Sequence, residues 1–144
     1  MRYQRACCAL ISGGSVKCWG ANSNGALGDG TTTSRSTPVS VSGLSGVSEL
    51  AAGSDVTCAR LSDGTAKCWG RAQYGLLGND NDTANQLTAV SVSGLTGASQ
   101  ISSRSQSTCA VISGNAVKCW GRNDKGQLGS TDTYDRLTPI QAGE

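Results

Sequence analysis

One motif occurs three times in this chain: two cysteines ten positions apart, with Trp-Gly directly after the second. Its tryptophans are Trp19, Trp69 and Trp120, so the motif recurs every 50 or 51 residues. A fixed period of about this length indicates a repeat protein. A unit this small cannot bury its own apolar face, so each copy must stack on its neighbours.

The repeat continues beyond the cysteines with segments that have the pattern of short strands. A Gly-x-Leu-Gly sequence and a polar loop follow each tryptophan, and an alternating segment comes next, at 38–42, at 89–93 and from Pro139 onward. Glycine-rich turns then lead into two further strand-like runs, at 47–52 and 98–102. No window shows a helical period. Four short strands per unit predict the four-stranded antiparallel blades of a β-propeller.

The combined motif resembles the repeat of the regulator of chromosome condensation family. The resemblance rests on Cys-Ala-Leu, Lys-Cys-Trp-Gly and Gly-x-Leu-Gly in fixed order, covers residues 6–142, and is closest to the cysteine-bearing version of bacterial secreted and surface proteins. It implies a seven-bladed propeller whose members mostly bind other proteins. One departure is Ala72, which stands where the other copies have Asn22 and Asn123 and puts the polar turn of that repeat in doubt.

These patterns predict an all-β chain that forms a partial propeller. We expect one repeat domain over 1–144, divided into an incomplete first repeat at 1–46, a second at 47–97 and a third at 98–144. A closed propeller needs about four to eight blades, so three blades predict an open arc that is a fragment of a larger ring. A self-sufficient open arc and a protomer that closes a ring with other copies are the alternatives.

The paired cysteines flank three hairpins, each with a three-residue loop. Counting outward from the turn places each pair face to face at a non-hydrogen-bonded site, where Cα atoms approach to about 4.5 Å. This spacing permits disulfides, and the predicted pairs are Cys8 with Cys18, Cys58 with Cys68, and Cys109 with Cys119. Reduced, buried cysteines are the alternative, and zinc is disfavoured because no histidine is present. Cys7 aligns with two threonines, and a plain replacement of threonine at the surface or in the core is the favoured interpretation; a free thiol or a link to a neighbour is the alternative.

The three tryptophans are expected to pack between adjacent blades, each ring filling the gap left by the Gly-x-Leu-Gly of its neighbour. The glycines that follow them, Gly20, Gly70 and Gly121, are expected to let the backbone pass close under these rings. The resembled family includes a photoreceptor that senses light with clustered tryptophans. No single repeat of this chain gathers tryptophans, so a structural role is favoured.

Composition excludes several classes of function. Without histidine, no Cys-His or Ser-His pair can be built, so we expect no enzyme and no cofactor. A net charge of +2 with both signs interspersed offers no basic face for nucleic acid. No apolar run is long enough for a membrane span. Acidic loops at 80–83 and 131–135 could gather calcium, but the first copy offers only Asp29, so solvated loops without metal are expected.

Comparison of the copies locates a candidate binding surface in the turn after each Trp-Gly. The scaffold positions repeat there, whereas this four-residue turn differs in every copy. Tyrosine and arginine are enriched at interface hot spots, and the candidates for partner binding are Arg71, Tyr74, Arg122 and Lys125. Ordinary solvated turns are the alternative interpretation.

The sequence therefore predicts a non-catalytic protein-binding module in a secreted or surface bacterial protein. Three disulfides would require an oxidising compartment, and the partner would be another protein, with the remaining blades of the same gene product among the candidates. Purely structural or adhesive repeats of a large surface protein are the first alternative. A regulator that acts like a guanine-nucleotide exchange factor, as the resemblance also implies, is the second.

Overall fold

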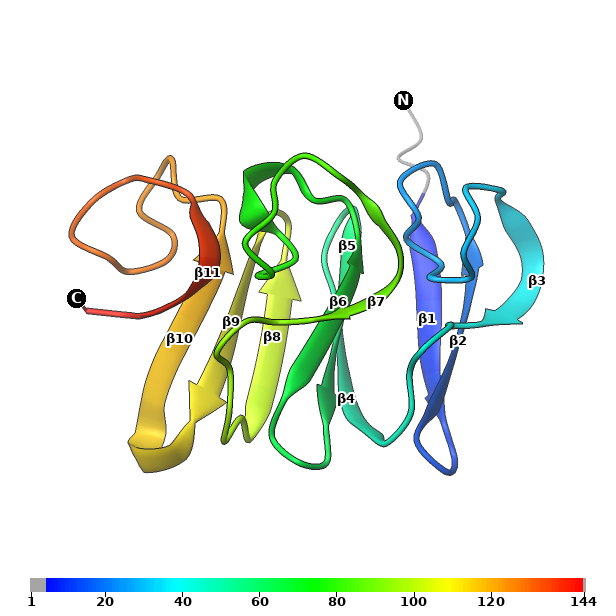
Figure 1. Cartoon of the computed structure of the whole chain (residues 1–144), viewed down its shortest axis with the longest axis horizontal. Helices are drawn as coiled ribbons and strands as arrows, with labels where there is room; N and C mark the ends of the chain where they lie inside the picture. The colour runs from blue at the N-terminus through cyan, green and yellow to red at the C-terminus, as the bar shows by residue number, and fades with distance from the viewer. Residues whose placement is uncertain (1–4, 144) are drawn as a thin grey trace.

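The computed structural model describes residues 5–143 as three antiparallel β-sheets that follow one another along the longest axis of the molecule (Figure 1). The first sheet contains β1 (Ala6–Ile11), β2 (Ser15–Gly20) and β3 (Arg35–Ser40). The second contains β4 (Val47–Ala52), β5 (Val56–Leu61), β6 (Ala66–Gly70) and β7 (Gln86–Ser91). The third contains β8 (Gln100–Arg104), β9 (Ser107–Ile112), β10 (Ala116–Gly121) and β11 (Arg136–Gln141).

In each four-stranded sheet the strands lie side by side in chain order, and every neighbouring pair is antiparallel. Hairpins β1–β2, β5–β6 and β9–β10 correspond to one another, and β4 and β8 add an inner strand to the second and third sheets. This meander repeated about an axis is the blade architecture of a propeller. The predicted all-β partial propeller is therefore confirmed, and we call the three sheets blades 1, 2 and 3.

The outermost strand of each blade begins earlier than the sequence pattern indicates. Strand β3 starts at Arg35 and β7 at Gln86, whereas alternation becomes visible only from Pro38 and Ala89. Most of the β3 side chains are exposed, so the first residues of the strand need not alternate between apolar and polar. Each outer strand also pairs across a register shift, at Cys18/Gly20 in blade 1.

The core consists of two apolar layers, one at each junction between blades. The first junction joins blades 1 and 2 through Val16, Cys18, Leu27, Val41, Val47, Ala59 and Trp69. The second junction joins blades 2 and 3, and its largest fully buried side chains are Trp120, Leu76, Leu77 and Val56. The blades thus bury their faces against one another, as the repeat period requires.

The hairpin loops have the left-handed backbone that their sequences predict. Gly14 and Gly64 have φ of +77° and +84°, and Asn115 replaces them at φ +60°. Asparagine reaches this region more readily than most residues. At Gly64 a side chain would also collide with the next blade, because an added Cβ would lie 3.0 Å from the Gly97 nitrogen.

Candidate functional site

The structure contains the three disulfides that the hairpin register predicts, Cys8–Cys18, Cys58–Cys68 and Cys109–Cys119. In each pair the two residues lie directly opposite across the hairpin, with Cα atoms 4.1 Å apart. The disulfides of blades 1 and 2 face the next blade, where a threonine hydroxyl lies 4.0 Å from one sulfur, at Thr57 and Thr108 respectively. Cys7 is a free, exposed thiol.

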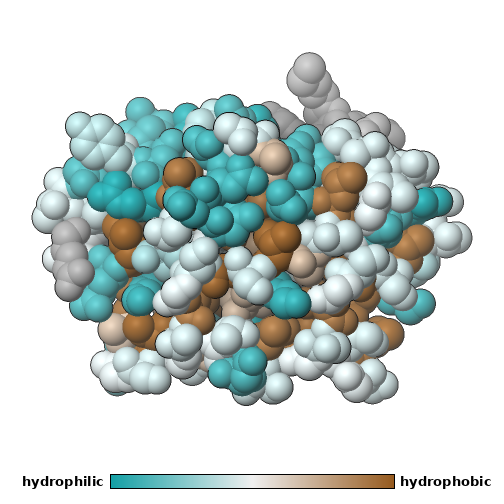
Figure 2. Space-filling view, viewed as in Figure 1, coloured by the Kyte–Doolittle hydropathy of each residue, from teal (hydrophilic) through white to brown (hydrophobic). Residues whose placement is uncertain are grey.

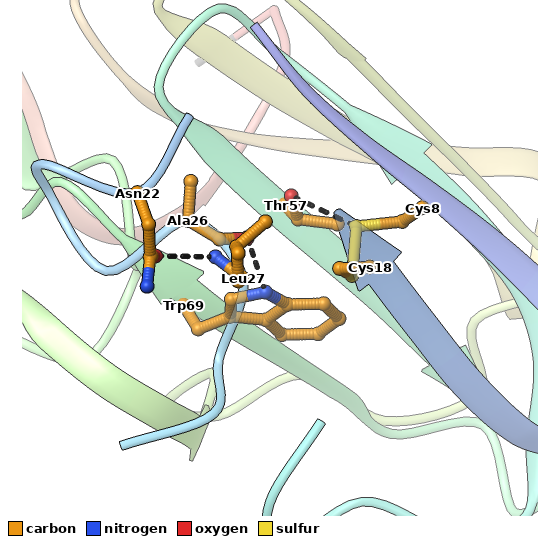
Figure 3. Close-up of a disulfide and its surroundings, with 7 residues drawn as sticks. All are labelled: Cys8, Cys18, Asn22, Ala26, Leu27, Thr57 and Trp69. Carbon is orange, nitrogen blue, oxygen red and sulfur yellow. Dashed lines mark hydrogen bonds between the residues drawn. A yellow bond between two sulfur atoms is a disulfide. The ribbon is translucent and has the colours of Figure 1, made fainter. Parts of the chain in front are cut away.

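A tryptophan from each following blade closes each junction, as Figure 3 shows for Trp69. The Trp69 side chain is 0% exposed, and its Nε1 donates a hydrogen bond to the Ala26 carbonyl at 2.9 Å. Its indole lies on Gly28, the last glycine of the blade 1 Gly-x-Leu-Gly, where an added Cβ would come within 3.0 Å of the ring. Trp120 lies on Gly78 in the same way. Trp19 has no such cover among residues 5–143 and is only half-buried.

The glycines after the tryptophans allow a close approach of the backbone. An added Cβ at Gly20, Gly70 and Gly121 would lie 2.6, 2.5 and 2.8 Å from the carbonyl oxygens of Arg5, Asp55 and Gln106. Each has φ above +100°, a conformation that a side chain would strain. They allow the end of one hairpin strand to approach the start of its partner closely.

Asparagines in the turns of blades 1 and 3 organise the loops that carry Gly-x-Leu-Gly. Asn22 is 0% exposed, and its Oδ1 accepts a hydrogen bond from the Leu27 N–H at 2.9 Å (Figure 3). Its Nδ2 donates to the Thr31 carbonyl, also at 2.9 Å. Asn123 makes the equivalent bond to Leu128 at 3.0 Å. Ala72 occupies the same buried position in blade 2 and has no amide to offer. This difference is visible in the sequence, whereas the burial of the position is not.

The partner-binding candidates lie along one edge of the three blades, the upper edge in Figure 1. We call this edge the loop face and define it by residues 53–55, 71–85, 104–106 and 122–135. Backbone hydrogen bonds connect its segments, from Ser54 to Ser105 and from Arg122 to Gln106. Hydrophilic residues gather along this edge in the space-filling view (Figure 2).

Two of the four candidates meet across the second junction. The Arg122 guanidinium lies over the Tyr74 ring, 4.9 Å from its centroid, which is a cation–π arrangement. Tyr74 belongs to the short 3-10 helix η1 (Gln73–Gly75) and has φ +65°. The stack therefore joins a blade 2 loop to a blade 3 loop and fixes the aromatic ring at the surface.

Some of the charged residues on the loop face form ion pairs and others do not. Arg71 forms an ion pair with Asp55 at 3.3 Å, and Arg122 forms one with Asp124 at 2.9 Å. A hydrogen bond from Gln127, together with the charges of Arg122 and Lys125, holds the pKa of Asp124 below its ordinary value. The Lys125 side chain has no ion-pair partner among the described residues.

Arg104 is a candidate that the sequence analysis missed. It ends strand β8, is exposed, and lines a hollow of about 500 Å³ together with Gln106, Arg122 and Lys125. No ion pair is formed by Arg104 within residues 5–143. Its counterpart in blade 2 is Gly53, so comparison of the inner-strand ends between copies, and not of the post-tryptophan turn alone, would have found it.

Two further features matter in the described part of the chain, metal-ligand clusters and membrane helices. Within it, no three or more cysteine, aspartate or glutamate side chains gather in a geometry that would hold a metal ion. No helix of the described residues is both long and apolar enough to cross a membrane.

Comparison with known proteins identifies the repeat. Models of the regulator of chromosome condensation (RCC1) repeat match residues 13–60 and 47–76. The ultraviolet-B receptor UVR8 of Arabidopsis thaliana is 36% identical over 142 residues, which cover 94% of this chain and 32% of the receptor. The chain therefore spans about a third of the length of this relative.

Solved structures show the same fold. Prp20p of Saccharomyces cerevisiae, described with its binding to Gsp1p and histones, superposes with a TM-score of 0.85 at 16% identity, covering 97% of this chain and 36% of Prp20p. Human WBSCR16 superposes with a TM-score of 0.83 at 21% identity, covering 95% and 35%. The family models and the sequence relative show that the chain contains repeats of the regulator of chromosome condensation family, and the third blade has the same strand order as the second.

Proposed function

We propose that this chain is a non-catalytic protein-binding module whose loop face binds an acidic region of another protein. The observation that carries the proposal is the Tyr74–Arg122 stack, which holds an aromatic ring and a guanidinium together at the surface of the second junction. Arg104 and Lys125 lie beside it around one hollow. Tyrosine and arginine are the side chains that most often dominate binding energy at interfaces.

The charges around the hollow favour a carboxylate-bearing partner. Asp124 forms an ion pair with Arg122, so within residues 5–143 the charges at the hollow that lack an ion-pair partner are the cations Arg104 and Lys125. Such exposed charges chiefly accelerate encounter and select the partner, and their effect should weaken as salt rises. Binding of Gsp1p and histones by Prp20p shows that related propellers bind proteins.

We further propose that this chain is part of a secreted or surface protein of a bacterium. Three disulfides support this assignment, because such bonds persist in oxidising compartments and are rare in the cytosol. The same bonds disfavour a regulator of the nucleotide-exchange type, which would work in a reducing compartment.

Affinity capture tests the proposal. The immobilised chain is incubated with culture medium, and retained proteins are identified at low and high salt. Arg104→Glu with Lys125→Glu should reduce retention of the partner by about tenfold or more, because one unfavourable charge pair at an interface can cost this much. The matched control is Lys67→Glu with Lys118→Glu, two equal charge changes on strands β6 and β10 away from the hollow.

The proposal is supported if the control variant still retains the partner protein and the loop-face variant does not. Equal retention by both variants, or no specific protein retained by the unmodified chain, would refute it and favour purely structural or adhesive repeats. Tyr74→Ala gives a second measurement, because it removes the aromatic anchor without changing the charge.

A further inference from the structure

A second hollow opens on the loop face, where the inner strands of the blades end. It has a volume of about 400 Å³ and lies between the end of β4, the end of β8 and the residue that precedes β1. Residues of all three blades therefore contribute to it. Its lining consists of Arg5, Ala52, Gly53, Ser54 and residues 103–105. We call this site the inner hollow.

Contacts between the strand ends of blades 2 and 3 give the inner hollow its shape. The Ser54 N–H donates a hydrogen bond to the Ser105 carbonyl at 3.2 Å. Gly53 makes this approach possible, because an added Cβ would lie 2.9 Å from the Ser105 carbonyl oxygen and 3.0 Å from Ser103 Oγ. Ser105 has φ +54°, which is uncommon for a residue other than glycine. Backbone strain of this kind is concentrated at functional sites.

The charged side chains that line the inner hollow are both arginines. Arg5 and Arg104 are exposed and belong to different blades, and neither forms an ion pair within residues 5–143. Asp55 directly follows the lining residues of blade 2, but it is paired with Arg71 at 3.3 Å. The neighbouring hollow differs, because it contains Asp124 besides its cations. The inner hollow is therefore lined by positive charge without a carboxylate among the described residues.

Hydroxyl groups add further hydrogen-bond donors to the inner hollow. Ser54 and Ser105 are exposed, and their hydroxyls make no hydrogen bond among the described residues. The Ser103 hydroxyl differs, since it accepts a hydrogen bond from the Thr108 hydroxyl at 2.9 Å. Two guanidinium groups and two hydroxyls are thus available to a ligand. A phosphate monoester has three acceptor oxygens and roughly two negative charges at neutral pH, so it matches these donors better than a carboxylate with two oxygens.

We propose that the inner hollow binds a phosphorylated side chain in the acidic region of the partner, with Arg5 and Arg104 as its guanidinium contacts. This inference rests on the proposed function and adds the chemical class of a group that the partner carries. Arg104 also lines the neighbouring hollow, so one acidic segment of the partner spans both. Guanidinium groups bind phosphate through pairs of parallel hydrogen bonds, which fix its orientation as well as its position.

Binding of peptides and of inorganic phosphate tests the inference. An acidic peptide that carries phosphoserine should bind the full chain about tenfold more tightly than the same peptide with serine, because hydrogen bonds to charged groups are about twice as strong as neutral ones. Inorganic phosphate should shift the amide resonances of Ser54 and Ser105, whereas acetate at the same ionic strength should shift them much less. Ser54→Asp places a carboxylate in the inner hollow and should abolish the preference for phosphoserine. Its control is Ser45→Asp, in the exposed turn between β3 and β4.

Arg5→Gln gives a second measurement, because it removes one guanidinium and leaves Arg104 and Lys125 in place. It should lower the affinity for the phosphoserine peptide about tenfold and leave the affinity for the serine peptide nearly unchanged. Lys118→Gln, on strand β10, is the control.

Equal affinities for the two peptides would overturn the inference. It would equally fail if the folded Ser54→Asp and Arg5→Gln proteins kept the preference for phosphoserine, or if an oligonucleotide of equal charge bound more tightly than the phosphoserine peptide. In each of these cases the proposed function still stands if Arg104→Glu with Lys125→Glu reduces retention of the partner protein, so the two failures are distinguishable.

Discussion

The first junction satisfies its buried polar side chains, whereas the second leaves Trp120 Nε1 and Asn79 Oδ1 without partners among the described residues. The difference is traced to one turn residue, because Asn22 in blade 1 is replaced by Ala72 in blade 2. The Asn22 side chain donates a hydrogen bond to Asp29, and the Asn123 side chain donates one to Ser130. In blade 2 the position of these two acceptors is occupied by Asn79. Because Ala72 has no side-chain amide, the Asn79 Oδ1 receives no hydrogen bond from this position.

The consequence extends to the neighbouring blade. Asn22 also binds the Leu27 N–H and so positions the Ala26 carbonyl that accepts from Trp69. The equivalent loop of blade 2 turns through η1, and the Leu76 carbonyl is not an acceptor for Trp120. A single turn residue therefore decides whether the tryptophan of the following blade is hydrogen-bonded.

The largest expected effect comes from removing the tryptophan of the first junction. Trp69→Ala should lower the free energy of unfolding by about 3–5 kcal/mol, the range for truncating a buried large aromatic side chain. Trp19→Ala should cost much less in the monomer, because its ring is only half-buried. Urea unfolding of both variants measures the difference. Equal costs would mean that the repeat position, and not the neighbouring blade, determines the role of the ring.

Restoring the missing amide should repair the second junction. Ala72→Asn should raise the free energy of unfolding by about 1 kcal/mol, the typical net gain of a buried hydrogen bond. Ala84→Asn, in the exposed part of the same loop, is the control and should be close to neutral. A double-mutant cycle with Asn79→Ala should show coupling. A loss of stability in Ala72→Asn would mean that the buried space at position 72 cannot hold the larger side chain.

A smaller effect should separate the two buried indoles. Trp69→Phe deletes a hydrogen-bonded N–H and leaves the Ala26 carbonyl unpaired, whereas Trp120→Phe deletes an N–H that has no partner. Both variants lose the same volume, so the difference of about 1 kcal/mol reports the hydrogen bond alone. In the Ala72→Asn background this difference should shrink. Equal losses for both variants would show that the two indoles are equivalent in solution.

Most of the architecture was predictable from the sequence because the same repeat occurs three times in it. The hairpin register followed from the spacing of the cysteines around three-residue loops, and it placed Cys58 opposite Cys68. The strand at 47–52 was also predicted with its observed bounds. These elements are buried on at least one face, so their alternation is constrained.

The features that escaped prediction have no repeating pattern of apolar and polar residues in the sequence. The outer strands begin early because exposed residues such as Ser36 and Thr37 carry no pattern. By contrast, the tryptophans were expected to fill the gap left by a neighbouring Gly-x-Leu-Gly, and the rings of Trp69 and Trp120 do lie on Gly28 and Gly78. Arg104 joins the loop face only because β8 ends beside the β10–β11 loop. Sequence position alone does not show that the end of one strand lies beside a loop that comes later in the same blade.

The smallest expected effect distinguishes the junctions by pH. Burial raises the pKa of Asp29, but hydrogen bonds from Thr31, Arg35 and Asn22 outweigh it and hold the pKa below the ordinary 3.8. A lowered pKa in the folded state stabilises the protein above pH 3.8, and this contribution is lost as the pH falls through the folded value. Blades 2 and 3 have Asn79 and Ser130 at this position, and neither of these side chains titrates in this range.

Acid should therefore weaken the blade 1 loop selectively. Urea unfolding of the unmodified chain and of Asp29→Asn at about pH 6 and about pH 3 measures this contribution, with the exposed Asp82→Asn as the control. Other aspartates, such as Asp132 beside Arg136, contribute equally to all three proteins and cancel in the comparison. Asp29→Asn should lose less stability on acidification than the other two. The same loss in all three would show that Asp29 does not distinguish the first junction from the second.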